Sequence, residues 1–217
     1  YWSRCRITLP DKILERQWYL EMYKFGAASR KDAPPICLQA VWTADNGQTP
    51  PWRGDFHNDL NTQLSYWPGY ASNHMEESDW LWKIKQNSED YTKQFFGVEG
   101  LNVPCISTLD GKNLGGWNQY SHQPSTSGWL AHHFYLQWKY SADTCFLKEK
   151  AYPWVKESAR YFENISEKGK NGMRKLPLSS SPEINDNRPD AWFTETTNFD
   201  LACIRFTLQA AGEMADS

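Results

Sequence analysis

Apolar side chains recur at a spacing of about 3.6 residues along much of the chain, which is typical of amphipathic helices. The first such segment runs from Pro10 to Arg30, where Asp11 is a candidate N-cap and Gly26 falls near the end. A second helix is expected to begin near Asp55 or Asn58 and to stop before Pro68. Four more are predicted at 75–96, 128–142, 146–165 and 199–214, with Pro153 marking a break or a fresh start. No stretch alternates convincingly between apolar and polar residues, so the fold class predicted is all-α.

Three long segments rich in glycine, proline, aspartate and asparagine separate these helices, at 31–54, 97–124 and 166–192. Loops longer than about 12–15 residues in a compact domain usually carry a site or are disordered. These three are rich in tryptophan and glycine rather than low in complexity, so we expect them to be ordered. Long loops gathered at one end of antiparallel helix pairs favour part of an (α/α)6 toroid or barrel, with the site formed by the loops. No short repeat of fixed length is present, which argues against a solenoid.

The richest concentration of candidate chemistry is segment 52–68, which reads WRGDFHNDLNTQLSYWP. Buried amides and carboxylates are costly unless each finds a partner, so this composition is unlike that of a core segment. In sugar-binding sites, by contrast, amides and carboxylates engage hydroxyl groups while flat aromatic faces cover the C–H side of the ring. The segment supplies four candidate substrate-binding residues, Trp52, His57, Tyr66 and Trp67. The alternative is a polar loop that happens to be rich in aromatic residues.

Composition and charge argue against some classes of partner. The formal net charge of −3 and the pI near 6.0 argue against a nucleic-acid partner. The mean hydropathy of −0.74, without a long apolar run, predicts a soluble chain with no membrane partner. Twelve tryptophans in 217 residues favour a carbohydrate-handling protein. The five cysteines lie far apart with no Cys-x-x-Cys pair, which favours buried free thiols, although one disulfide remains possible.

The pair Asp59 and Asn61 is the first catalytic candidate. A carboxylate and an amide two residues apart can converge in an extended or capping segment, where they can orient and deprotonate a water molecule. The alternative is that Asp59 or Asn58 caps the following helix.

Glu183 is the second catalytic candidate. Flanked by proline and small polar residues on an irregular loop, it can project into a cleft as a general acid. The alternative is a solvated loop glutamate.

The helix expected at 128–142 begins with Trp129 and contains the adjacent pair His132 and His133. Histidines that bind zinc from one helix are normally four residues apart, so adjacent histidines do not predict a metal site. We expect His132 to contact substrate, together with Trp129 and with Trp117 from the loop at 97–124.

Four segments, in this order, resemble glycoside hydrolase family 95, whose best-known members are inverting α-L-fucosidases. Asp59–Pro68 is similar to the family motif Asn-x-Asn-x-Gln/Glu-Met-Asn-Tyr-Trp-Pro, and Asn73–Glu76 resembles Asn-Leu-x-Glu. The segment from Gly128 through Pro153 resembles an inner helix pair of the family, and Ser181–Glu183 resembles the Ser-Pro-Glu-Asn segment that carries the general acid. The chain departs from the motif where Asp59 replaces the first asparagine and Ser65 the one before the tyrosine.

The resemblance implies hydrolysis of a terminal sugar, α-L-fucose or L-galactose, from an oligosaccharide or polysaccharide, without a cofactor. Glu183 would protonate the glycosidic oxygen, and Asp59 and Asn61 would activate water. Inversion implies that the carboxyl groups of Asp59 and Glu183 lie roughly 6.5–9.5 Å apart. Two other functions stay open: another (α/α)6 glycosidase or phosphorylase, and a carbohydrate-binding protein without catalysis.

The resemblance also sets expectations about the extent of the domain. Residues 1–217 are expected to form a single incomplete domain, about the first half of the barrel, whose remainder would cover apolar faces left open here. A third catalytic acidic residue is expected in the part of the family's domain that follows residue 217. We expect a periplasmic or extracellular protein, although the sequence shows no signal peptide.

Overall fold

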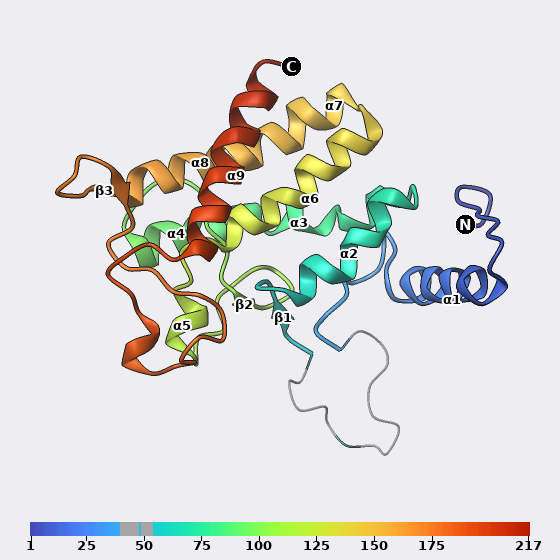
Figure 1. The fold of residues 1–217 in the computed structure, drawn as a ribbon, viewed down its shortest axis with the longest axis horizontal. Helices are drawn as coiled ribbons and strands as arrows, with labels where there is room; N and C mark the ends of the chain where they lie inside the picture. The colour runs from blue at the N-terminus through green and yellow to red at the C-terminus, as the bar shows by residue number, and fades with distance from the viewer. Residues whose placement is uncertain (40–47, 49–53) are drawn as a thin grey trace.

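The computed structural model describes residues 1–39, 48 and 54–217, and the described chain is mainly helical (Figure 1). Its α-helices are α1 Lys12–Ala28, α2 Asn61–Ala71, α3 Trp80–Lys83, α4 Lys85–Phe96, α5 Asn118–Ser121, α6 Thr126–Ser141, α7 Thr144–Phe146, α8 Tyr152–Ile165 and α9 Asn198–Ala215. Shorter helical segments are η1 Met75–Ser78, η2 Leu147–Ala151 and η3 Pro189–Ala191, of which η2 is a π-helix. Four two-residue strands are β1 Phe56–His57, β2 Ile106–Ser107, β3 Glu167–Lys168 and β4 Arg174–Lys175. The prediction of a mainly helical fold is confirmed.

Local signals placed several helix ends correctly. The carboxylate of Asp11 accepts hydrogen bonds from the backbone N–H groups of Ile13 and Leu14, which caps α1 as the sequence predicts. Pro153 lies in the first turn of α8, where its missing N–H costs nothing. Between α6 and α8 the chain turns through α7 and the π-helical segment, so the region predicted as one helix from Phe146 starts as two shorter ones.

Two predicted helices differ from the structure. We expected the second helix to stop before Pro68, but α2 runs through this proline to Ala71. The lost hydrogen bond would have used the carbonyl of Leu64, which lies on the exposed side of the helix, whereas Tyr70 in the next turn is buried. Residues 75–96 form η1, α3 and α4 instead of one helix, which lets Trp80, Leu81 and Ile84 all reach the core.

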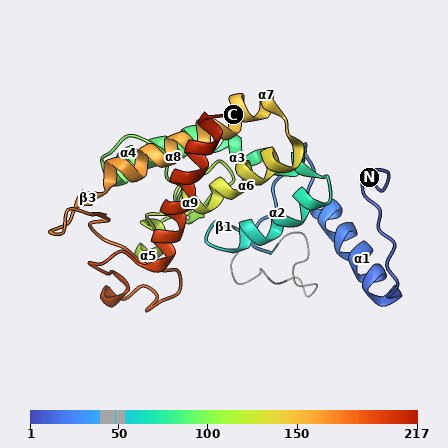
Figure 2. The same ribbon diagram turned by 45° about the horizontal axis from the view of Figure 1, so that its top comes forward.

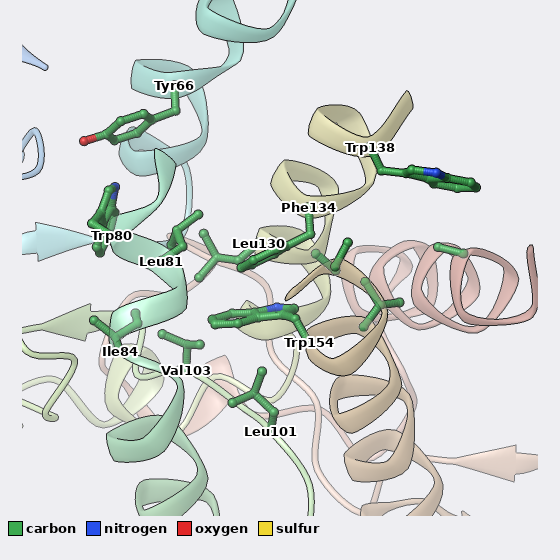
Figure 3. Packing of buried hydrophobic residues seen from close by; sticks show 14 of the residues in the cluster. Tyr66, Trp80, Leu81, Ile84, Leu101, Val103, Leu130, Phe134, Trp138 and Trp154 are labelled. Carbon is green, nitrogen blue, oxygen red and sulfur yellow. The ribbon is translucent and has the colours of Figure 1, made fainter. Parts of the chain in front are cut away.

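Helix α6 is central to the packing, because it contacts α2, α8 and α9. Figure 3 shows Leu130 and Phe134 of α6 pointing at Trp154 of α8, with Leu81 on the other side of the cluster. The rings of Phe134 and Trp154 are stacked at 4.5 Å, and Trp154 is fully buried. Burial of these large aromatic side chains stabilises the fold, since each removes about 150–250 Å² from water.

The loops at 97–124 and 166–197 meet on one side of the helices, beside α5 in both views (Figures 1 and 2). Strand β1, just before α2, pairs antiparallel with β2, so that Phe56 faces Ser107 and His57 faces Ile106. Buried Asp200, at the start of α9, accepts hydrogen bonds from Ser125 Oγ at 2.6 Å and from Ser179 Oγ. These bonds bring three distant parts of the sequence together.

Helix α1 lies beside α2 and apart from the other helices (Figure 1). Met22 and Phe25 are buried in the core, but Ile13 and Leu14 of the predicted apolar face are 80% and 58% exposed. The prediction of buried thiols holds for Cys105 and Cys203 and is wrong for Cys145, which is exposed. In the described ranges, no helix has both the length and the apolar character needed to cross a membrane.

Candidate active site

A cavity of about 290 Å³ lies where the N-terminal end of α2 faces the loop between β4 and η3. Asp59 and Asn61 line it from the α2 side, Glu183 from the loop, and Trp129 from the first turn of α6. Its other lining residues are Leu60, Ser181, Pro182 and Phe199. The structure therefore brings together all three predicted catalytic residues and one of the predicted aromatic ones.

The segment that carries Asp59 is held by its neighbour Asn58. The Asn58 side-chain amide donates hydrogen bonds to the Pro104 carbonyl and to Ser107 Oγ, both at 3.0 Å, and its backbone N–H donates to the Cys105 carbonyl at 2.7 Å. Asn58 is therefore hydrogen-bonded both to the loop that precedes β2 and to Ser107 of β2 itself. The alternative that Asp59 or Asn58 caps α2 is wrong, because the N-cap position is Leu60 and α2 has no side-chain cap hydrogen bond.

Asp59 is only 9% exposed, and burial is the main cause that raises the pKa of its carboxyl group above the ordinary aspartate value. The negative charge of Glu183 raises this pKa further. A backbone hydrogen bond at Asp59, the nearby His57 and a hydrogen bond with the Cys105 thiol oppose this rise, because each favours the carboxylate. Asp59 therefore keeps its proton to a higher pH than a solvated aspartate, which suits a group that must accept a proton from water near neutral pH.

Glu183 is exposed at the cavity and sits on a tight turn in which the Ile184 N–H donates to the Ser181 carbonyl at 3.1 Å. Its φ angle is +66°, in the left-handed region that residues other than glycine rarely adopt. Asn185 and Asp186 also have positive φ angles, of 58° and 47°. Strained backbone of this kind persists only where surrounding contacts over-determine it, and it is frequent at functional sites.

Two residues near the site escaped the sequence-based prediction, Gln119 and Tyr120 of α5. Tyr120 is buried, and its pKa is raised to about 12, first by burial and then by the charges of Asp186, Asp59 and Glu183. Its ring packs against predicted Trp117 at 5.4 Å, while Trp117 itself does not line the cavity. The only sequence signal was the proximity of both residues to Trp117, since a four-residue helix has no readable periodicity.

Tyr66 and Trp67, predicted to bind substrate, do not line the cavity. Tyr66 is 1% exposed in the core, where its hydroxyl accepts a hydrogen bond from the Ile36 N–H at 2.8 Å. Trp67 is half-buried. Both follow Asn61 by more than one turn of α2, so the helix rotation of about 100° per residue directs them elsewhere. Trp52 lies outside the described residues.

His57 lies behind the cavity on β1, with its Nε2 atom 3.2 Å from Asp55 Oδ2. His57 does not line the cavity, and its charge lowers the pKa of Asp59.

His132 packs away from the cavity, since its ring contacts Phe206 of α9 at 3.8 Å and burial lowers its pKa. The neighbouring His133 is buried and contacts Tyr70 of α2. Adjacent residues on a helix face different directions, so these two contact different elements. Within the part of the chain that the structure describes, no three His, Cys, Asp or Glu side chains are close enough to hold a metal ion.

Comparison with known proteins extends the resemblance over nearly the whole chain. The family model described as glycosyl hydrolase family 95 catalytic domain matches residues 11–217. The chain is 26% identical over 202 residues to alpha-L-fucosidase 2 of Arabidopsis thaliana, covering 89% of this chain and 24% of that protein. It is 26% identical over 147 residues to probable alpha-fucosidase A of Aspergillus niger, covering 64% of this chain and 18% of that protein. The chain thus spans no more than about a quarter of these curated relatives.

A solved structure, described as a putative kojibiose phosphorylase from human microbiome, superposes with a TM-score of 0.58 at 12% identity. The match covers 90% of this chain and 28% of that one. At this level of identity the likeness concerns the fold, and it agrees with the predicted (α/α)6 architecture. Because the match to the glycosyl hydrolase family 95 catalytic domain covers all but the first ten residues, the chain belongs to this family.

Proposed function

We propose that the complete protein containing this sequence removes a terminal sugar of the α-L-fucose or L-galactose type from an oligosaccharide or polysaccharide, with inversion at the anomeric carbon. The observation that carries this proposal is that Asp59, Asn61 and Glu183, from distant parts of the sequence, line one cavity. Glycoside hydrolysis generally uses a pair of Asp or Glu side chains that flank the glycosidic bond, and this cavity contains such a pair. The names of the two fucosidase relatives support the choice of sugar.

The proposed reaction has two proton transfers, one from Glu183 and one to Asp59. The Glu183 carboxylic acid gives its proton to the glycosidic oxygen as the bond from that oxygen to the anomeric carbon breaks. Asp59, as carboxylate, takes a proton from the water whose oxygen forms the new bond on the opposite face of the ring, and Asn61 orients that water. The raised pKa of Asp59 makes its carboxylate a stronger base than that of a solvated aspartate.

Asp59 stands where the family motif has asparagine, and we propose that its carboxylate accepts the proton itself. The Trp129 ring, which packs against Phe199 at 5.5 Å, would provide an apolar wall for the C–H face of the sugar. His57 favours the Asp59 carboxylate and so opposes part of the effect of burial.

The test uses the complete protein, a panel of glycosides and three variants. Glu183→Gln is expected to lower kcat on a disaccharide by about 10²–10⁴-fold, the usual worth of a general acid. Asp59→Asn is expected to lower kcat by a factor in the same range. Glu195→Gln changes an exposed glutamate of the same loop and serves as the matched control, which should keep wild-type activity.

The stereochemistry and the competing functions are read in the same assay. Proton NMR of the first product should show the anomer opposite to that of the substrate, and retention would contradict the mechanism. Release of a sugar 1-phosphate that depends on added phosphate would identify a phosphorylase instead. Binding without turnover in wild type and in Glu183→Gln would favour a carbohydrate-binding protein and overturn the proposal.

A further inference from the structure

The turn that carries Glu183 is bridged by one buried side chain from another part of the sequence. Gln119 Nε2 donates hydrogen bonds to the Ser181 carbonyl at 3.0 Å and to the Ile184 carbonyl at 2.9 Å. The two acceptors flank Pro182 and Glu183, so one amide group closes the turn across the proposed acid. Two carbonyl acceptors on the same atom also fix which end of the side chain carries the nitrogen, since only the NH₂ group can donate twice.

Gln119 is itself held in place. It is 1% exposed and lies in α5, whose Ser121 carbonyl accepts a hydrogen bond from the hydroxyl of buried Tyr91 on α4. Figure 1 shows α5 next to the loop that follows β4. The amide therefore projects from a fixed element onto a segment with no regular secondary structure, and its two bonds connect positions 62 and 65 residues apart.

The backbone at Glu183 needs such support. Three of the four residues from 183 to 186 have positive φ angles, which is unfavourable for residues with a Cβ atom. The Asp200 carboxylate fixes Ser179 and Ser180, before the turn, but it does not reach across Glu183. The Ile184 N–H to Ser181 carbonyl bond and the Asn185 side-chain bond to the Asp190 carbonyl hold the turn from within its own segment, whereas the amide of Gln119 ties it to α5. Loss of that amide would let the turn shift relative to α5 and would move the Glu183 carboxyl group with it.

We propose that Gln119 is a positioning residue for the general acid, which holds the strained turn so that the carboxyl group of Glu183 faces the leaving-group oxygen. This inference rests on the proposed function, because it assumes that Glu183 is the acid. Gln119 does not line the cavity, so any effect on the reaction must pass through the turn that carries Glu183.

The test separates acid catalysis from general damage by changing the leaving group. A disaccharide needs protonation of its leaving oxygen, whereas the matching glycosyl fluoride depends far less on the acid. Gln119→Met removes both donors and keeps the length of the side chain. We expect kcat on the disaccharide to fall roughly 10- to 100-fold, the loss of two neutral hydrogen bonds, with little change on the fluoride.

Gln63→Met is the matched control. Gln63 is equally buried, and its amide donates to the Asn58 carbonyl at 2.8 Å, on the water side of the cavity. Loss of this hydrogen bond should lower kcat on the disaccharide and on the fluoride by the same factor. If Gln119→Met also lowers kcat on the disaccharide and on the fluoride equally, the inference is overturned.

A double-mutant cycle tests whether Gln119 acts through Glu183. Adding Gln119→Met to Glu183→Gln should cost the disaccharide reaction almost nothing further, because the acid is already lost. Full additivity of the two losses would overturn the inference. If Gln119→Met does not fold, Gln119→Glu is the second variant, since it has the same shape but turns carboxylate oxygens toward two carbonyls. If the wild-type protein hydrolyses the disaccharide and the Glu183→Gln variant does so at the same rate, that result would instead contradict the proposed function.

Discussion

The hydroxyl group of Tyr70 lies 2.5 Å from Nδ1 of His133, which joins the last turn of α2 to the middle of α6 in the buried interior. The same imidazole is edge-on to Tyr66, at 6.4 Å between ring centroids. Burial lowers the pKa of His133 to about 3, with a smaller contribution from the neighbouring His132. His133 is therefore neutral in the folded protein over the physiological range, and its hydrogen bond to Tyr70 is one between neutral groups.

This pair predicts how stability changes with pH. The folded-state pKa of His133 is about 3, while an unfolded histidine has a pKa of about 6.5, so the unfolded chain binds the proton first. Stability should fall as pH drops below about 6.5 toward 3. His133→Gln removes the titrating group and should reduce the loss of Tm between pH 7 and pH 5. Tyr70→Phe keeps the imidazole and should lower Tm at both values, and an unchanged pH dependence in His133→Gln would contradict this assignment.

The acidic side of the activity profile should report on Asp59. Because burial raises its pKa, kcat/KM should fall as pH decreases through a value above the usual aspartate pKa of about 3.9. The thiol of Cys105 lowers that pKa by donating to the carboxylate, so Cys105→Ala should move the acidic limb to higher pH. Cys105→Ser keeps a donor and is the matched control. A limb that stays in place in Cys105→Ala would remove Asp59 as the group that controls it.

Asp200 is expected to be the costliest carboxylate to change in the loop region. It is fully buried and accepts from Gln123, Ser125 and Ser179. Asp200→Ala leaves these donors without an acceptor and should cost about 1–3 kcal/mol or more, measured as a lower Tm. Asp190→Asn alters an exposed ion pair with Arg188 in the same region and should leave Tm nearly unchanged. Equal effects of the two variants would refute the role given to the buried carboxylate.

Two glycines should respond in opposite directions to alanine. Gly100 has a φ angle of +118°, and a Cβ there would lie 2.5 Å from the backbone nitrogen of Tyr161, so Gly100→Ala should destabilise by about 1–3 kcal/mol or more. Gly212 lies in α9 with open space where a Cβ atom would project, and Gly212→Ala should stabilise by roughly 0.5–1 kcal/mol. Melting curves of the two variants provide the comparison, and a stabilising Gly100→Ala would show that the loop and α8 are not in close contact.

Helix positions were predictable where the signal is local. The cap at Asp11 and the start at Pro153 depend on atoms within one turn, and both agree with the structure. The end of α2 was not predictable, because the burial of Tyr70 against another helix outweighs the preference of Pro68. The exposed side of α1 shows the same limit, since periodicity marks an apolar face without saying what covers it.

The candidate site was only partly predictable. Asp59, Asn61 and Glu183, predicted from their types and their neighbours in the sequence, line one cavity, and their catalytic roles stay a prediction. His132 has an equally suggestive sequence setting, yet α9 covers it through Phe206. Gln119 has no local signal at all, because its role depends on two carbonyl groups more than 60 residues away.

The sequence by itself determined the helical class, several helix ends and the chemical types available for catalysis. These depend on interactions within about four residues, which repeat wherever the same pattern occurs. The tertiary structure decided which side chains share a cavity, which histidine is buried against which helix, and what holds the turn of Glu183. Those outcomes arise from packing and hydrogen bonds between distant segments, whose partners no local pattern specifies.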